Sequence, residues 1–138
     1  MRSIKADNGA FLRLCPKCGP ANAVSFEFNN DNNAKWILSR SGTKLLIKAY
    51  SNNNYLSRCN NCWLGATYPD AAFARQITPN EPYSQWIPAP TADGKWTFHA
   101  DNGKYLSRCT NCATSTVPNL AFLNETNPAM PYAQFTFV

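Results

Sequence analysis

The sequence lacks the signals that favour α-helix. Proline, glycine and asparagine interrupt the chain every few residues, so that no long regular segment stands between them. The intervening runs are short and rich in β-branched and aromatic residues, as at 44–49, 95–100 and 134–138. Such runs, closely spaced and bounded by turn residues, are typical of strands. We therefore expect an all-β fold.

The sequence also lacks a long apolar run. No stretch of ~18 apolar residues is present, so no membrane-spanning segment is expected. The first seven residues, from Met1 to Asp7, contain no apolar core of the kind that a signal peptide has. Localisation is left open: the protein stays inside the cell, it has lost a leader, or it is exported by an unconventional route.

Clusters of one charge are absent too. The 13 lysines and arginines contribute to a net charge of +5, but they are scattered and no two are adjacent. A protein that binds nucleic acid usually concentrates basic residues in a stripe or patch. We expect no specific nucleic-acid binding, and we interpret the charge as a contribution to solubility.

Residues suited to catalysis are scarce. The one histidine, His99, occupies the place that Lys5 and Lys48 hold in two similar segments, which indicates an exposed strand position. Without a second histidine, no Cys-His or Ser-His arrangement can recur. The eight carboxylates are dispersed, and no glycine loop suited to phosphate is present. We expect a protein that is not an enzyme and that uses no cofactor.

What the sequence does contain is an internal repeat. Residues 101–112 read DNGKYLSRCTNC and nearly repeat residues 52–62, which read NNNYLSRCNNC. A third and more diverged copy, DNGAFLRLCPKC, occupies residues 7–18. The first cysteines of the three copies are 44 and then 50 residues apart. This spacing predicts three structural units of similar length.

Each unit is expected to hold four strands. The first strand ends at the alanine before the turn, and Asn8-Gly9 and Asn102-Gly103 favour a two-residue type I′ hairpin. The second strand runs into the CxxC motif, the third carries a small residue beside an apolar one, and the fourth carries an aromatic. The pairs in the third strands are Ala23-Val24, Ala72-Phe73 and Ala121-Phe122, and the aromatics are Trp36, Trp86 and Phe135.

Three units of four strands, with a period of ~40–50 residues, fit few architectures. A propeller also has four-stranded blades, but it usually has at least ~4 of them. A β-trefoil has three units. We therefore predict a single β-trefoil domain over residues 1–138, with pseudo-symmetric repeats at approximately 1–41, 42–91 and 92–138.

The repeats also resemble two groups of β-trefoils. Residues 103–107, GKYLS, look like a strand of the fascin-like domains. Gln85-Trp86 and Gln134-Phe135 are similar to the QxW strand of ricin-B-like lectins, with the intervening residue missing. The resemblance implies a barrel of six strands capped by three hairpins. Repeated apolar residues are then expected in the shared core: Trp36, Trp86, Phe135, Leu12, Leu56 and Leu106.

All six cysteines lie in CxxC pairs, and this pattern has several interpretations. A zinc site needs four ligands, usually two such pairs brought together, and three symmetry-related pairs would be held apart. A thioredoxin-type redox site needs a helix after the motif, and haem attachment needs CxxCH. The pattern favours a local disulfide in each pair over free thiols or metal, and we expect no metal site. The pairs are Cys15/Cys18, Cys59/Cys62 and Cys109/Cys112.

Ligand-binding residues are expected in the loops after the CxxC pairs, because these loops differ most between the units and loops commonly carry function. Trp63 and Tyr68 lie outside the core pattern, so at least one of them is expected to offer an exposed ring face to a sugar. Asn22, Asp70 and Asn119 each precede a third strand and are expected to bind sugar hydroxyls.

We expect a carbohydrate-binding protein, a β-trefoil lectin, because the resemblance implies that small stand-alone β-trefoils are frequently lectins. Several sites on one chain would give avidity toward clustered ligands. The expected partners are glycans or glycoproteins, and the assembly, a monomer or a homodimer, is left open. Two alternatives remain: a fascin-like module that binds actin or another protein, and a protease inhibitor that acts through loops 63–70 or 76–83.

Overall fold

The computed structural model describes all residues from 1 to 138 and contains strands and three short 3-10 turns, with no α-helix. Four strands belong to each of three consecutive units. Unit one holds β1 (Ile4–Lys5), β2 (Phe11–Leu14), β3 (Val24–Glu27), η1 (Asn32–Ala34) and β4 (Trp36–Ser41). Unit two holds β5 (Lys44–Ala49), β6 (Tyr55–Asn60), β7 (Asp70–Gln76), η2 (Pro82–Ser84) and β8 (Ile87–Pro90). Unit three holds β9 (Trp96–His99), β10 (Tyr105–Thr110), β11 (Asn119–Glu125), η3 (Pro131–Ala133) and β12 (Thr136–Phe137).

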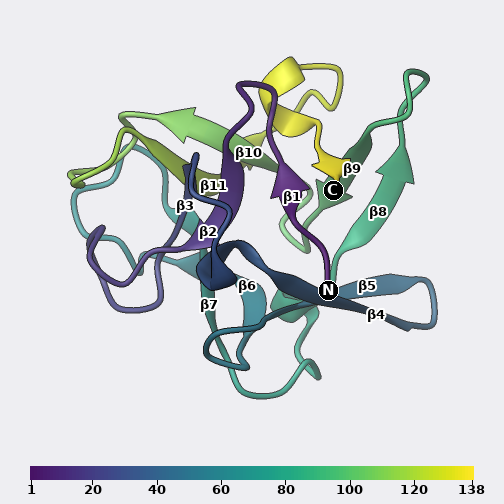
Figure 1. Ribbon diagram of the computed structural model, residues 1–138, viewed down its shortest axis with the longest axis horizontal. Helices are drawn as coiled ribbons and strands as arrows, with labels where there is room; N and C mark the ends of the chain where they lie inside the picture. Colours follow the sequence, from purple (N-terminus) through teal and green to yellow (C-terminus); the bar gives the residue numbers. More distant parts are fainter.

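The first and fourth strands of the units form the barrel. β4 pairs with β5, β8 with β9 and β12 with β1, always antiparallel, so that each pair joins two consecutive units. The last of these pairings, in which Ile4 lies opposite Phe137, brings the two ends of the chain to the same side of the molecule (Figure 1). The predicted all-β fold and the β-trefoil architecture are confirmed.

The hairpins β2–β3, β6–β7 and β10–β11 cap the barrel and lie together in the left half of Figure 1. They meet around a pseudo-threefold axis. There each third strand is joined to each of the other two by one pair of bridging residues. This register places Ser25, and not Val24 as expected, at the position of Phe73 and Phe122. Unit one therefore contributes no aromatic ring at this position. The bridging pairs are Ala23–Phe73, Ala71–Phe122 and Leu120–Ser25.

The core has two parts. The six repeated residues that were predicted for it are at most 1 % exposed: Trp36, Trp86, Phe135, Leu12, Leu56 and Leu106. The indole N–H groups of Trp36 and Trp86 donate to the carbonyls of Leu12 and Leu56, at 2.9 and 3.1 Å, and so tie barrel strands to the hairpins. A smaller second core fills the cap and contains the cysteines with Trp63, Phe73 and Phe122.

Each CxxC pair forms a local disulfide, which confirms the expected bonding. The disulfides stand at the ends of β2, β6 and β10, where each hairpin enters the loop to its third strand. They join Cys15 to Cys18, Cys59 to Cys62 and Cys109 to Cys112.

The Asn-Gly turns differ from the type I′ hairpin that was predicted. That hairpin needs a positive φ at two consecutive residues, but only the glycines Gly9 and Gly103 have one, at 86° and 80°. The asparagines before them act through their side chains instead. The Oδ1 atoms of Asn8 and Asn102 accept the backbone N–H two residues further on, each at 3.0 Å.

Candidate functional site

Trp63, the predicted aromatic platform, is buried in the cap. Its side chain is 7 % exposed and packs against Phe73 and Phe122, with ring centroids 6.1 and 6.2 Å away. Gly19 lies against the indole, where an added Cβ would be 2.5 Å from the ring. Residues of all three units therefore enclose this tryptophan. At least one of Trp63 and Tyr68 was expected to be exposed: Trp63 is the buried one and packs the cap, whereas Tyr68 is exposed.

Asp70, predicted to bind sugar hydroxyls, is also buried, at 8 % exposed. Its carboxylate accepts hydrogen bonds from Arg58, Asn60 and Asn102, at 2.9, 2.9 and 3.0 Å. Burial raises the pKa of Asp70, but these hydrogen bonds outweigh burial and hold the pKa below its ordinary value. Both carboxylate oxygens are thus engaged inside the protein, which corrects the expectation that Asp70 faces a ligand.

Asn119 and Asn22 lie at the equivalent places of the other two units. The Oδ1 atom of Asn119 accepts from Arg108 at 2.9 Å and from Thr110 at 2.7 Å. Asn22 has a positive φ of 67°, and its Oδ1 lies 3.4 Å from the amide nitrogen of Asn52 in the next unit. The three predicted polar residues therefore belong to the contacts that order the hairpins and join them to neighbouring units.

The arginines of the second strands complete these contacts. Arg58 donates two hydrogen bonds to Asp101, at 2.6 and 3.0 Å, and Arg108 donates two to Asp7, at 2.8 and 3.1 Å. Each aspartate belongs to the first turn of the next unit around the barrel. Unit one has Leu14 at the place of these arginines, so the bidentate pair occurs at two seams of the three.

Two clefts lie beside the exposed sides of the disulfides of units two and three. They have volumes of about 320 and 290 Å³, at the lower end of the roughly 300–1,000 Å³ of small-molecule sites. Each combines the end of a second strand, the end of a third strand and a tyrosine from the 3-10 turn. Cleft two is lined by Arg58, Cys59, Asn60, Cys62, Arg75, Gln76 and Tyr83. Cleft three is lined by Tyr68, Arg108, Cys109, Thr110, Cys112, Asn124 and Tyr132.

Cleft three contains two tyrosines. Tyr68 is 39 % exposed and comes from unit two, where the neighbouring Thr67 N–H donates to the carbonyl of Cys112 at 2.7 Å. Tyr132 comes from η3, and its interaction with Glu125 lowers the pKa of the Glu125 carboxyl and raises that of the Tyr132 hydroxyl. Tyr68 is thus the one residue of the predicted set that lines this cleft.

Cleft two has a different composition, because the last residue but one of its third strand is Arg75. The Nη1 atom of Arg75 lies 3.3 Å from Sγ of Cys59 and 3.4 Å from Sγ of Cys62. Tyr83 of η2 takes the place of Tyr132. Sequence reasoning missed both tyrosines, although the sequence carries a signal for them: Pro-Tyr precedes Ser-Gln-Trp in unit two and Ala-Gln-Phe in unit three.

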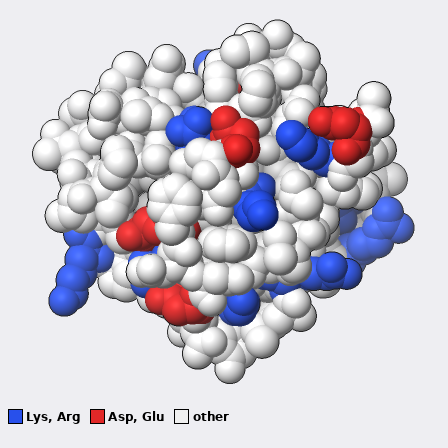
Figure 2. Space-filling view, turned by 45° about the horizontal axis from the view of Figure 1, so that its top comes forward, with Lys and Arg blue, Asp and Glu red and all other residues white.

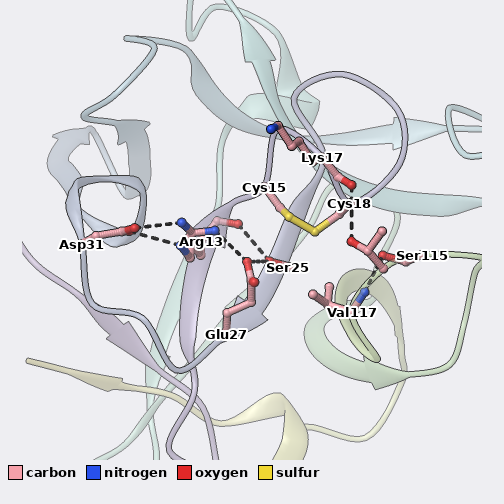
Figure 3. Close-up of a disulfide and its surroundings, with 10 residues drawn as sticks. Arg13, Cys15, Lys17, Cys18, Ser25, Glu27, Asp31, Ser115 and Val117 are labelled. Carbon is pink, nitrogen blue, oxygen red and sulfur yellow. Dashed lines mark hydrogen bonds and ion pairs between the residues drawn. A yellow bond between two sulfur atoms is a disulfide. The ribbon is translucent and has the colours of Figure 1, made fainter.

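Unit one has no such cleft beside its disulfide. Figure 3 shows Arg13 between two carboxylates, with Nη1 2.8 Å from Glu27 and Nη2 2.8 Å from Asp31. Glu27 and the sulfurs of Cys15 and Cys18 bring ligand atoms within 4.8 Å of one another. Because the two sulfurs are joined in a disulfide, they are not the thiolates that a metal ion would need.

A further hollow of about 290 Å³ lies between units one and three. Phe28, which is 69 % exposed, forms one side of it, and Asn29 and Pro118 line it as well. Asn119 also lies on this hollow, but its Oδ1 atom is bound to Arg108, as described above. The hollow thus offers an exposed ring but few free polar groups.

The surface carries no continuous basic patch on the face drawn in Figure 2. Lysines and arginines stand singly there, and several are next to carboxylates. The arginines of the second strands are ion-paired, as the distances above show. No helix in the chain has the length and apolar character that crossing a bilayer requires.

Comparisons with known proteins give the fold. No family model matches the sequence, and no curated protein matches it. Among solved structures, the GlcNAcα1-4Gal-releasing endo-β-galactosidase from Clostridium perfringens aligns with 99 % of this chain, with a TM-score of 0.72 and 16 % identity. A mosquitocidal holotoxin aligns with 99 % of the chain, with a TM-score of 0.76 and 14 % identity.

The designed three-fold symmetric protein ThreeFoil is similar over 99 % of this chain and 96 % of its own length, with a TM-score of 0.72 and 16 % identity. By contrast, the chain spans 31 % of the endo-β-galactosidase and 16 % of the holotoxin. At these identities the likeness concerns the fold alone.

Proposed function

We propose that this β-trefoil domain binds carbohydrate, that cleft three is its principal site and that cleft two is a second one. The observation that carries the proposal is the composition of cleft three. Tyr68 and Tyr132 line a hollow beside the guanidinium of Arg108 and the hydroxyl of Thr110, which the protein also engages, and beside the amide of Asn124. These are the groups that a sugar ring needs, since its C–H face packs on aromatic rings and its hydroxyls both donate and accept hydrogen bonds.

The size of the clefts supports a small ligand. A hollow of about 290 Å³ accommodates one ring of an oligosaccharide rather than an extended chain. Two related clefts on one domain would let a branched or clustered glycan bind at both, which raises the effective affinity without new contacts.

The groups in the clefts favour binding over catalysis. Neither lining contains a carboxylate or the histidine, whereas glycoside hydrolysis usually needs two carboxyl groups on either side of the bond. His99 lies on the barrel side of unit three and stacks on Tyr105, with ring centroids 4.6 Å apart. The name of one structural neighbour, a galactosidase, supports carbohydrate as the ligand class at the level of fold analogy.

The test is a glycan array at modest salt with four proteins: wild type, Tyr68→Ala, Tyr132→Ala and Tyr50→Ala. Tyr50 is the control, because it is 44 % exposed and lines no cleft. We expect saturable binding that free sugar competes, weakened roughly tenfold by each cleft substitution and unchanged by Tyr50→Ala.

A blank array from folded wild-type protein would contradict the proposal. So would binding that neither cleft substitution weakens. Actin co-sedimentation and peptidase inhibition would then test the two alternatives, and the exposed Ile77, at the start of the 76–83 loop, would be the first residue to replace in the peptidase assay.

A further inference from the structure

One position distinguishes the three units at their disulfides. It is the residue two positions after Ser25, Phe73 and Phe122 in the third strands: Glu27 in unit one, Arg75 in unit two and Asn124 in unit three. Arg75 lies within 3.4 Å of both sulfurs of its own unit, and the amide nitrogen of Asn124 lies 3.7 Å from Sγ of Cys109. Glu27 also stands beside its disulfide, as Figure 3 shows. An anionic, a cationic and a neutral side chain thus occupy equivalent places.

The protein engages two of these three side chains elsewhere. Glu27 accepts hydrogen bonds from Arg13 and from the hydroxyl of Ser25, both at 2.8 Å. Asn124 accepts a short hydrogen bond from the hydroxyl of Ser107. Their polar groups therefore serve the hairpins of their own units.

Arg75 has no such partner. The ion pairs of the chain involve Arg13, Arg58, Arg108 and Lys95, and none involves Arg75. Its Nη1 contacts only the disulfide sulfurs, which are weak and uncharged acceptors, and its Nε and Nη2 have no hydrogen-bond partner in the protein.

The other arginine of cleft two is neutralised. Arg58 is bound by both Asp70 and Asp101, at 2.9 and 2.6 Å. Arg75, an exposed side chain beside the amide of Gln76 and the ring of Tyr83, is thus the one cation of this lining without a carboxylate partner. A guanidinium with free N–H groups recognises planar carboxylates and sulfate esters through paired hydrogen bonds.

We infer that cleft two binds an anionic sugar residue, one that carries a carboxylate or a sulfate ester, while cleft three binds a neutral one. The inference rests on the proposed carbohydrate-binding function and adds the ligand class of each cleft. Arg75 supplies the charge contact in cleft two, and Asn124 offers only an amide in its place in cleft three.

The experiment is an array in which each neutral oligosaccharide is paired with its sialylated and its sulfated derivative. The proteins are wild type, Arg75→Asn, Asn124→Arg and Arg40→Asn. Arg40, an exposed residue of the β4–β5 hairpin, is the matched control, because its loss lowers the net charge equally and lies away from the clefts. Near-ultraviolet circular dichroism confirms that each variant is folded.

Wild type is expected to bind acidic members roughly tenfold more tightly than their neutral counterparts, and Arg75→Asn is expected to remove that preference. Asn124→Arg should extend the preference to cleft three, and Arg40→Asn should leave it unchanged. The relative response to sialylated and sulfated members identifies which anion is preferred.

Two results overturn the inference while the proposed function stands: neutral members bind as well as acidic ones, or Arg40→Asn lowers acidic binding as much as Arg75→Asn does. The second result would mean that the overall positive charge attracts acidic glycans without a site. If no member of any pair binds, the proposed function fails and the inference fails with it.

Discussion

The residue after each CxxC motif is Gly19 in unit one, Trp63 in unit two and Ala113 in unit three. At this equivalent position, one unit thus has a large side chain and the other two have a small residue. Three equivalent side chains at a threefold axis compete for one space, and three indoles would not fit there. The single indole of Trp63 fills the space because Gly19 offers it a surface without a Cβ. The broken symmetry is therefore a packing requirement.

Replacement of Gly19 by alanine tests this packing. Its Cβ would lie 2.5 Å from Cζ2 of Trp63 and 3.0 Å from Cε2, so the indole must move. We expect a loss of about 1–3 kcal/mol in the free energy of unfolding, measured by urea denaturation. In Gly19→Ala/Trp63→Phe the smaller ring should relieve the overlap, so the double variant should lose less than the sum of the single ones. A Gly19→Ala protein as stable as wild type would refute the tight contact.

Trp63 also shows what sequence reasoning could not supply at this scale. Trp63 and Tyr68 both stand outside the repeat pattern, which predicts only that at least one of them is exposed, because core positions of a repeat are expected to recur. At the axis of the cap this reasoning fails, because there is room for a large side chain from only one of the three units. Tyr68, five residues later, is the exposed one of the two.

The disulfides of units one and two are the same element in different environments. Cys15 and Cys18 are buried, at 5 and 2 % exposed, and stand beside the carboxylate of Glu27. Cys59 and Cys62 are half-buried and lie against the guanidinium of Arg75. Reduction by a dithiol needs access to a sulfur, and a nearby positive charge stabilises the thiolate that leaves.

We therefore expect limited treatment with dithiothreitol to reduce Cys59–Cys62 first and Cys15–Cys18 last. Alkylation of the new thiols followed by peptide mass spectrometry measures the order. Arg75→Asn should slow reduction of Cys59–Cys62 several-fold, because the leaving thiolate loses its charged neighbour. If Cys15–Cys18 were labelled as early as Cys59–Cys62, burial and charge would not control the order.

Most of the elements could be predicted from the repeat, because strand positions, core aromatics and cysteines recur at similar spacings. The turn geometry could not, since Asn-Gly is compatible with more than one turn and the side chains of Asn8 and Asn102 decide which forms. The clefts also escaped prediction. Their residues come from strand ends and 3-10 turns that are far apart in sequence, and the fold alone brings Arg58 near Tyr83.

On the scale of the whole molecule, ion pairs join the units at two seams. Arg58 of unit two holds Asp101 of unit three, and Arg108 of unit three holds Asp7 of unit one. At the third seam Leu14 takes the place of the arginine, and the turn of unit two that would carry the aspartate has Ser51. The arginine and the aspartate are thus both absent at this seam, so that no unpaired charge remains there. The Arg108–Asp7 pair is the one that joins unit three to unit one.

The Arg108–Asp7 link makes stability depend on pH in a defined direction. The hydrogen bonds from Arg108 lower the pKa of Asp7 below its ordinary value of 3.8. The folded protein therefore holds the Asp7 proton less tightly than the unfolded chain does. This contribution to stability is fully present above about pH 5, and it is lost as the pH falls through the unfolded and then the folded pKa.

Asp7→Asn is accordingly expected to lower the free energy of unfolding by about 1 kcal/mol at pH 7, since the pair is mostly shielded from solvent but not fully buried. At about pH 2.5 the difference from wild type should shrink, because the carboxyl of Asp7 is then largely protonated in the unfolded chain. Urea denaturation of both proteins at the two pH values measures this difference in the free energy of unfolding. Glu81→Gln, at the exposed N-cap of η2 and outside every ion pair of the chain, is the control for removal of a carboxylate. A difference that stays constant with pH would mean that Asp7 contributes through its turn alone. A difference that shrinks only for Asp7→Asn would show that closure of the three units depends on this charge.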